Sequence, residues 1–284
     1  MSFKPTRTVS NNSENFEERK YPTPKAGVRP GRISLIVDLG IQEQEDYEDP
    51  KTKKVTKRKP VHKVAYFADL TSDVVDYGGS IGEQPYRLAL FPTYKGKVNG
   101  SNFGAVPPKI KGGLWTFHSN SLHAKLARAT GTEEIISEGD DNLDISLLLG
   151  KAARFQVEVK ERETDYLDDE GNKKIFTDVK FKGVMSTEVP SDPTNPDSPM
   201  TNVKVNDLHI NPMIISWDGV TEDQIKYLRK DIRSTIKQAT NYEGSRMQML
   251  IEKHEGGGEE TKQDMSSTVD VSTNDDAFDK DVEF

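Results

Sequence analysis

The chain has 284 residues, of which 33% are hydrophobic and 30% charged, and it contains no cysteine. Without cysteine, disulfide frameworks and thiolate metal or redox sites are excluded, and the composition fits a reducing cytosol. No apolar run reaches the roughly 18 residues of a membrane-spanning helix, and the first residues lack the apolar core of a signal peptide, so we expect a soluble protein that is not exported.

The formal charge of −8 comes from one end of the chain. Residues 255–284 hold ten acidic residues and two lysines, which accounts for the whole net charge and leaves the remainder balanced. Such a block cannot bury enough apolar surface to offset its ordering entropy, so we predict a disordered acidic tail at 255–284. Residues 1–27 mix polar residues with proline without periodicity, which predicts a flexible N-terminal arm.

Three stretches of alternating apolar residues then predict strands within residues 31–40, 61–70 and 84–91. In the first stretch, the alternation places one set of side chains on a single buried face, namely Ile33, Leu35, Val37 and Leu39. In the other two, the positions predicted to be buried are Val64, Tyr66, Leu70, Tyr86, Leu88 and Leu90.

A short helix is predicted at 119–131, with serines as candidate N-caps and Gly131 as its stop. A helical turn then ends at Gly150, and Asp140, Asp141 and Asp144 before it are candidate caps. A strand follows with Phe155, Val157 and Val159 on one face. Residues 168–174 have hairpin-turn chemistry, and 175–184 form the partner strand.

The predicted order is therefore three strands, a helix and a two-stranded hairpin. This is the order of the OB-fold, a five-stranded barrel with a helix between its third and fourth strands. The expected class is mainly β with helical additions (α+β), and the barrel domain covers residues 28–217. Because one fold supports many functions, the barrel alone assigns none.

The segment after the barrel combines a proline-rich loop at 190–199 with two stretches, 203–210 and 213–217, that should pack back on the core. A C-terminal helix is predicted at 218–254, because Thr221 and Gln224 fit a capping box and an apolar stripe follows, formed by Ile225, Leu228, Ile232 and Ile236. A basic stripe beside it (Lys226, Lys230, Arg233 and Lys237) fits a solvated face, a partner site or a resting place for the acidic tail.

The other face of the predicted sheet interleaves aromatic and cationic side chains. Its members are Lys63, Phe67, Arg87, Phe91, Arg154, Lys160, Phe176, Lys180 and Lys182. Bases stack on aromatic rings while Lys and Arg follow phosphates, so this pattern suits single-stranded nucleic acid, and a solvated sheet face is the alternative. Trp115 and Phe117, next to two lysines in a loop, are candidate stacking residues, although Trp is as often a core anchor.

Between the first two strands, residues 51–63 carry seven cations and no acid. The loop cations selected as a backbone clamp are Lys53, Lys54, Lys57, Arg58 and Lys59. Alternatively, the acidic half of the same loop, residues 43–49, neutralises them. Catalytic patterns are weak: the five histidines have no ligand spacing, and the glycines lack a phosphate-loop Lys. We expect no enzymatic activity, no metal and no cofactor.

Taken together, "GRISLIVDLG", "VAYFADLTSDVVDYGG", "PYRLALF", "LLLGKAARFQVEV", "TDVKFKG" and the terminal "DVEF" resemble the single-stranded DNA-binding proteins of tailed bacteriophages. The resemblance implies a protein that coats single strands during phage DNA replication, recombination and repair in the cytoplasm of the infected bacterium. It also implies an acidic tail ending in an aromatic residue, which recruits the phage DNA polymerase, helicase-primase or related proteins. The tail determinants carried over are Asp275, Asp276, Phe278, Asp279, Asp281, Glu283 and Phe284.

The tail also has a physical rationale, because an acidic segment competes with phosphate for a cationic face until DNA displaces it. Its phenyl ring and terminal carboxylate can then bind a partner protein. Two other functions stay open: a strand-annealing or recombination mediator, and a non-enzymatic virion or adaptor protein that binds only protein. The sequence leaves open whether the chain is a monomer or a homodimer.

Overall fold

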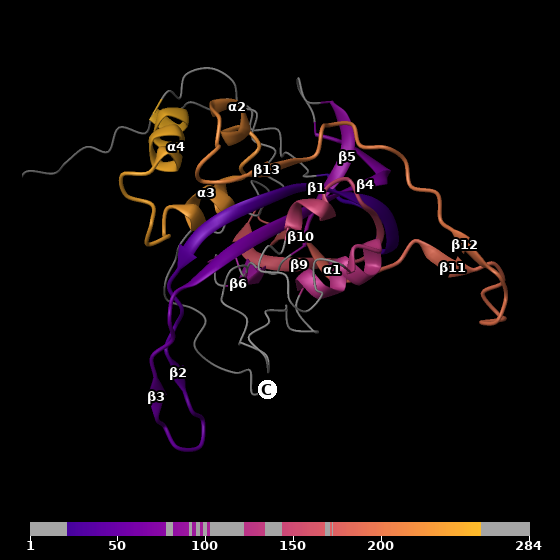
Figure 1. The fold of residues 1–284 in the computed structure, drawn as a ribbon, viewed down its shortest axis with the longest axis horizontal. Helices are drawn as coiled ribbons and strands as arrows, with labels where there is room; N and C mark the ends of the chain where they lie inside the picture. Colours follow the sequence, from indigo (N-terminus) through magenta and orange to yellow (C-terminus); the bar gives the residue numbers. More distant parts are fainter. Residues whose placement is uncertain are drawn as a thin grey trace, which may run out of the picture.

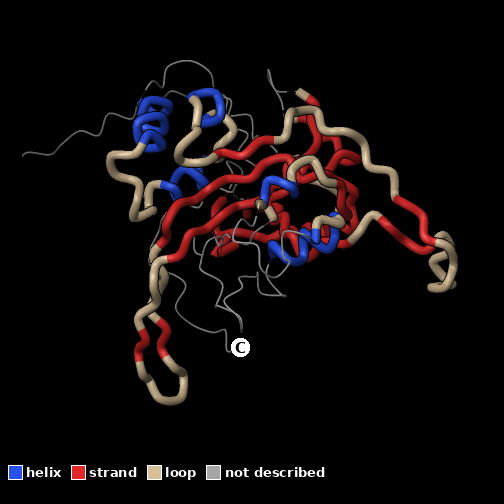
Figure 2. The backbone as a smooth tube through the Cα atoms, viewed as in Figure 1, coloured by secondary structure: helices blue, strands red, loops and turns tan. Residues whose placement is uncertain are grey.

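In the computed structural model, the described residues are 22–77, 82–90, 93–94, 97–98, 101–102, 122–133, 144–167, 171 and 173–256. The fold is mainly β with helical additions, which confirms the class predicted from the sequence (Figure 1; Figure 2). Phe91, Trp115, Phe117 and the whole of residues 257–284 lie outside the described residues.

Five strands form the central sheet in the order β10-β9-β1-β4-β5, and every neighbouring pair is antiparallel. They are β1 (Gly27–Gln42), β4 (Val61–Asp76), β5 (Glu83–Ala89), β9 (Ala152–Leu167) and β10 (Lys173–Met185). All five predicted strands are present. The backbone pairing of the described residues forms an open path that ends at β5 and β10, so the closed five-stranded barrel stays a prediction.

Two short strands extend this sheet. β13 (Met213–Ile215) pairs in parallel with the middle of β1, and β8 (Ser101–Asn102) pairs with the start of β4. The β13 pairing confirms that the segment 213–217 packs back on the core. A separate ladder joins β6 (Thr93–Tyr94) to β7 (Lys97–Val98).

β1 buries side chains on both of its faces, so the prediction of a single buried face is wrong. Its register with β4 shifts between Ile33 and Leu35, and such a bulge reverses which face the following residues occupy. Ile33 and Ile36 therefore join one apolar cluster, whereas Leu35 and its alternating successors join another. The only local sign of a second buried face is the run of three apolar residues at 35–37, which does not locate the bulge.

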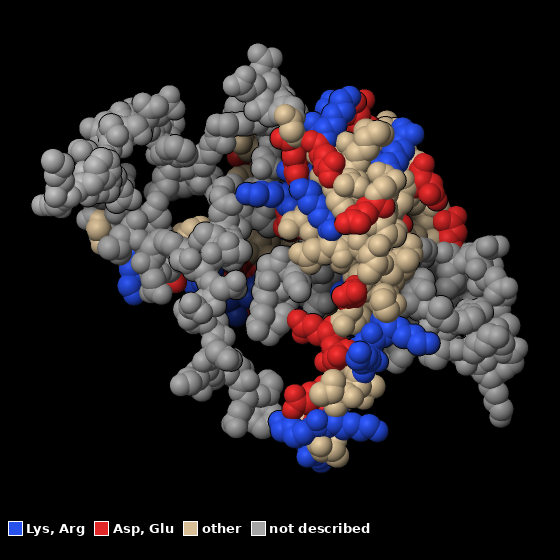
Figure 3. Space-filling model, turned by 90° about the vertical axis from the view of Figure 1, so that its left-hand side faces the viewer, with Lys and Arg blue, Asp and Glu red and all other residues tan. Residues whose placement is uncertain are grey.

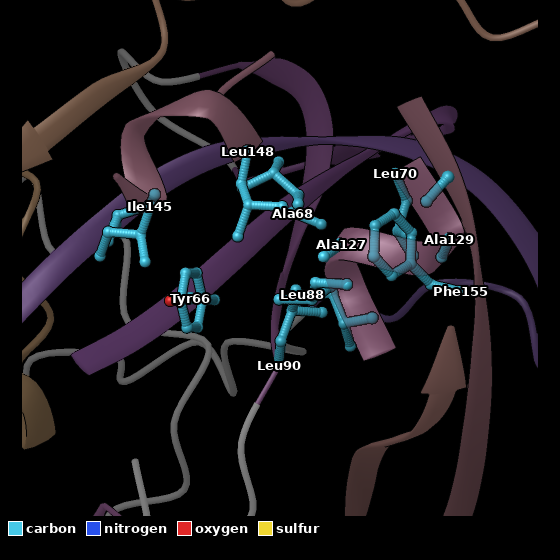
Figure 4. Packing of buried hydrophobic residues seen from close by; sticks show 14 of the residues in the cluster. Tyr66, Ala68, Leu70, Leu88, Leu90, Ala127, Ala129, Ile145, Leu148 and Phe155 are labelled. Atoms are coloured by element: carbon cyan, nitrogen blue, oxygen red, sulfur yellow. The ribbon is translucent and has the colours of Figure 1, made fainter. Parts of the chain in front are cut away.

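The inner cluster lies between the sheet, a helix and a 3₁₀ helix (Figure 4). Strand residues such as Tyr66, Leu88 and Phe155 pack there with α1 (Leu122–Thr130) and η2 (Ile145–Leu148). Gly131 ends α1 with a φ of +69°, a left-handed conformation that glycine adopts without strain, as predicted. Asp144 caps η2 by accepting a hydrogen bond from the Ser146 amide at 2.9 Å, which confirms one of the three predicted caps.

The outer cluster lies between the sheet and the C-terminal helices. Leu35, Val37 and Phe67 pack there against the predicted apolar stripe, all four members of which are buried. The predicted capping box is also present, with Thr221 and Gln224 bonded to each other's backbone amides. The helices cover the face of β4 that carries Phe67, which the sequence pattern had left open to solvent.

The single helix predicted at 218–254 is wrong, because the chain forms three: α2 (Glu222–Ile225), α3 (Lys230–Ile236) and α4 (Arg246–Gly256). The segment between α3 and α4 is tied to the end of β1. The Thr240 amide donates to the Ile41 carbonyl at 2.8 Å, and the Ile41 amide donates to Asn241 Oδ1 at 3.0 Å. These bonds need a bent chain there, and Gly244, with a φ of +74°, completes the turn.

Two hairpins project from the body in different directions (Figure 1). The β2–β3 arm, residues 43–60, connects β1 to β4 and contains β2 (Tyr47–Glu48) and β3 (Val55–Thr56). The β11–β12 arm, residues 186–203, follows β10 and contains β11 (Glu188–Pro190) and β12 (Met200–Asn202). Neither arm contributes a residue to the two apolar clusters.

Candidate nucleic-acid interface

The outer face of the β9–β10 hairpin brings together most of the predicted residues on these two strands. Directly opposed residues of antiparallel strands share a face. Lys160 lies opposite Asp178, Glu158 opposite Lys180, and Arg162 opposite Phe176. The intervening pairs, Val157 with Phe181 and Val159 with Val179, point to the inner cluster. The phase predicted for both strands is therefore correct.

Lys182 reaches the same outer face through a register shift. The pairing of β10 with β9 shifts between Phe181 and Gly183, and the Lys182 ammonium lies 2.9 Å from the carboxylate of Glu158. The Lys160 ammonium lies 3.0 Å from the same carboxylate. The hydrogen bond from Lys182 lowers the pKa of Glu158 most, and the hydrogen bond from Lys160 lowers it further. This glutamate is therefore ionised at neutral pH. Lys180 is exposed and has no carboxylate partner in the described part of the chain.

This hairpin surface carries four exposed cations against two carboxylates, with a half-buried phenyl ring among them. The cations are Lys160, Arg162, Lys180 and Lys182, the carboxylates are Glu158 and Asp178, and the ring is Phe176. Sequence reasoning missed Arg162, which lies 3.7 Å from Asp178. The signal was present, since Arg162 continues the every-second-residue series that includes Lys160.

Arg154 has a structural partner. Its Nε donates to the Ser186 carbonyl at 2.6 Å, at the base of the β11–β12 arm. The side chain is half-buried, and the bond fixes where the chain leaves β10. Arg154 thus lies at one end of the hairpin surface and orients the arm that follows.

Phe67 is not on an open surface, so its expected position is wrong. The side chain is 1% exposed in the outer cluster, and the Arg229 guanidinium lies 5.7 Å from the ring centroid. The helical layer explains the difference, because the face of β4 that carries Phe67 is the face that the helices cover.

Arg87 is also withdrawn from the surface. Its Nε donates to Asp69 Oδ1 at 2.8 Å, and the same oxygen accepts from the Ser34 hydroxyl at 2.8 Å. Burial lowers the pKa of Arg87, but the charge of Asp69 and its hydrogen bond, together with weaker interactions with Tyr77 and Tyr227, raise that pKa overall. Lys63, half-buried on β4, pairs in the backbone register with Asn102 of β8. Phe67, Arg87 and Lys63 are therefore not part of the β9–β10 surface, and Phe91, the remaining member predicted on the third strand, lies outside the described residues.

The β2–β3 arm exposes all five predicted loop cations: Lys53, Lys54, Lys57, Arg58 and Lys59. Its tip is ordered by Asp49, whose carboxylate accepts from the amides of Lys51 and Thr52, both at 2.8 Å. These bonds lower the pKa of Asp49. The Arg58 guanidinium lies over the Tyr47 ring, 5.2 Å from its centroid. Figure 3 shows Lys and Arg gathered at the end of the arm.

Neutralisation within this arm is limited. In the described structure, its single ion pair joins Lys53 to Glu48 at 3.3 Å, between two well-exposed side chains. Lys54, Lys57 and Lys59 extend into solvent, which favours an external anion over the acidic half of the same loop as their partner. An exposed tyrosine can also stack on an unpaired base while the neighbouring cations bind phosphate.

Other chemistry has little support in the described residues. No cluster of His, Asp and Glu there has the geometry of a metal site, and no helix there is long and apolar enough to cross a membrane. The basic stripe of the C-terminal helices is largely used internally, since Arg233 and Lys237 both bind Glu255.

No protein-family model, curated protein or solved structure matches this chain. The geometry of the site is therefore the basis for assigning a function.

Proposed function

We propose that this protein binds single-stranded DNA without strong sequence preference and performs no enzymatic reaction. The observation that carries the proposal is the outer surface of the β9–β10 hairpin, where four exposed cations share a face with Phe176. Alternating cations and rings can follow a phosphate backbone and stack its bases. The β2–β3 arm adds further exposed cations and Tyr47.

The strand order supports an OB-fold as the scaffold. β1 pairs with β4 along one part of its length and with β9 along another, and β5 and β10 occupy the two ends of the path. β5 and β10 also contact each other, as closure of a barrel would require. In OB-folds the loops between strands one and two and between strands four and five flank the oligonucleotide. Here those connections are the β2–β3 arm and the turn of the β9–β10 hairpin.

The resemblance to the single-stranded DNA-binding proteins of tailed phages supports a role for this activity in replication, recombination and repair in an infected bacterial cell. The acidic residues from Asp275 to Phe284 then act as a competitor of DNA and a recruitment site for replication proteins. Phosphate and carboxylate are alternative anions for the same lysines, so binding of DNA releases the tail.

The test is a titration of a short fluorescent oligo-dT at two salt concentrations. The double variant Lys180→Ala/Lys182→Ala is expected to bind about tenfold more weakly at low salt. Its log–log salt slope should fall by about 1.4, because each phosphate contact with a single strand contributes about 0.7. The matched control is Lys226→Ala/Lys253→Ala, which removes two exposed lysines of the C-terminal helices.

The control should bind like the wild type. If the wild-type protein does not bind oligo-dT in dilute buffer, the proposal fails and a role in binding only protein is favoured. Equal losses in the two double variants would show that overall charge, and not the β9–β10 surface, determines binding. If the protein makes complementary oligonucleotides pair faster than coating of the single strands alone would, it is instead a strand-annealing protein.

A further inference from the structure

The β11–β12 arm is an acidic projection that the proposed DNA interface does not use. Residues 186–203 contain Glu188, Asp192 and Asp197 and no Lys or Arg, and all three carboxylates are exposed. Phosphate would be repelled by this arm. Its surface also exposes an apolar side chain, Met200, which is 58% exposed. The arm thus has the chemistry of a protein contact.

This arm is ordered before it meets any partner. The Ser191 amide donates to the Pro199 carbonyl at 2.9 Å, and the Val203 amide donates to the Thr187 carbonyl at 2.9 Å. The Asp192 carboxylate accepts from the amide and the hydroxyl of Thr194, which lowers its pKa. Four prolines, at 190, 193, 196 and 199, further restrict the loop. Because the loop is preorganised, binding through it costs little conformational entropy.

The second half of the β2–β3 arm has the complementary properties, whereas its first half, residues 43–49, carries five carboxylates. After its turn it carries six cations in residues 51–59, of which Lys53 alone forms an ion pair in the described structure. It also exposes apolar surface, since Val55 is 58% exposed and Tyr47 is 44% exposed. A contact between the two kinds of arm would pair opposite charges and cover apolar side chains on both.

One copy cannot make this contact with itself. The two arms leave the body at different ends of the molecule, the β2–β3 arm at the lower left of Figure 1 and the β11–β12 arm at the far right. A contact between different surfaces of successive copies is heterologous, and it builds an open row unless the rotation closes a ring. An open row of copies matches the linear form of a DNA strand.

We propose that the β11–β12 arm of one copy binds the β2–β3 arm of the next copy on the same DNA strand, so that binding is cooperative. This inference rests on the proposed DNA-binding function. Exposed ion pairs are individually weak, so the contact does not hold free copies together. Neighbours on one strand are at effective concentrations on the order of millimolar, where a weak contact becomes populated. Only the strand at 51–59 is cationic, since the first half of the arm holds five carboxylates of its own, so the contact is expected at that strand.

The test compares a short oligo-dT that holds one copy with long poly-dT that holds many. In the variant Glu188→Lys/Asp197→Lys, Asp192 is kept because its carboxylate orders the loop. This variant should bind the short oligonucleotide like the wild type or slightly more tightly. On poly-dT its cooperativity should fall about tenfold, because a few exposed pairs together amount to about one decade in an equilibrium constant. The control with the same charge change, Asp218→Lys/Glu243→Lys, should keep wild-type cooperativity.

Charge reversal on the other arm completes the test. Lys54→Glu/Lys57→Glu should also lower cooperativity about tenfold, and it should weaken binding of the short oligonucleotide because phosphate contacts are lost. Combining both reversals should restore cooperativity on poly-dT while the affinity for the short oligonucleotide stays low. Failure of the combination to restore it, or wild-type binding of poly-dT without cooperativity, would overturn the contact between arms. Failure of the wild type to bind the short oligonucleotide would instead overturn the proposed function.

Discussion

Phe67 and Phe176 are both phenylalanines on strands of one sheet, but their surroundings give them different roles. Phe67 is enclosed by the outer cluster, where Leu35 and the C-terminal helices contact it. Phe176 is half-buried on the β9–β10 surface, opposite Arg162. Burial, not residue type, decides which ring can stack on a base.

We therefore expect opposite effects when each ring is removed. Phe67→Ala should lower the free energy of unfolding by about 3–5 kcal/mol, because it leaves a cavity beside the helices. Phe176→Ala should leave urea unfolding nearly unchanged and should weaken oligo-dT binding by about 1–3 kcal/mol, the value of one stacked base. Urea denaturation and anisotropy titration measure the two quantities. A large loss of stability in Phe176→Ala would show that its ring belongs to the core instead.

At the level of elements, the β2–β3 arm is a separable addition to the sheet. The pairing of β1 with β4 ends at Gln42, the last residue of β1, and Val61, the first residue of β4. These two residues lie directly opposite each other, and the arm extends beyond them. Replacing residues 43–60 by Asn-Gly would close this pair with a two-residue turn, the connection that antiparallel strands favour.

The shortened protein should fold with an unchanged far-ultraviolet circular dichroism signature for the body. Its affinity for oligo-dT should fall, and so should its salt slope, because the cations of the arm are lost. Cooperativity on poly-dT should disappear as well. Binding and cooperativity equal to those of the full chain would assign the arm to another partner.

The sequence predicted elements best where local pattern and tertiary burial agree. Phe155 and Val157 alternate with polar neighbours and do lie in the inner cluster, and Gly131 does end its helix. Prediction failed where distant contacts decided the outcome. The bulge after Ile33 depends on how β1 pairs with β4, and the break after Ile236 depends on hydrogen bonds to Ile41.

The candidate site shows the same division. The β9–β10 surface follows from strand alternation alone, so Lys160, Phe176 and Lys180 could be grouped correctly from sequence. The withdrawal of Phe67 depends on helices some 150 residues later, and that of Arg87 depends on its ion pair with Asp69 on the neighbouring strand, so strand alternation predicts neither. A strand with apolar residues on both faces is the one local sign of a second layer.

For the whole molecule, the distribution of charge is the property that governs DNA binding in our proposal. All of the net charge of −8 lies in residues 255–284, and the remainder is balanced. Deleting residues 275–284 should tighten oligo-dT binding at low salt, because a competing anion is removed. The difference should shrink as salt rises and screening weakens both interactions.

The same deletion should abolish binding of the replication polymerase in a pull-down. A full-length variant in which the acidic residues of 275–284 are changed to Asn and Gln separates charge from length. It should match the deletion in DNA affinity. Weaker or unchanged DNA binding by the shortened chain would contradict competition by the tail.

β1 belongs to both apolar clusters, and this has a consequence for how the protein can be divided. A fragment ending at residue 217 would keep the sheet but discard the helices that shield Leu35, Leu39 and Phe67. The surface of this fragment would then expose a large hydrophobic patch, and such patches promote aggregation. The sheet and the three helices should therefore be produced together, and a recombinant fragment that ends after Gly256 contains both.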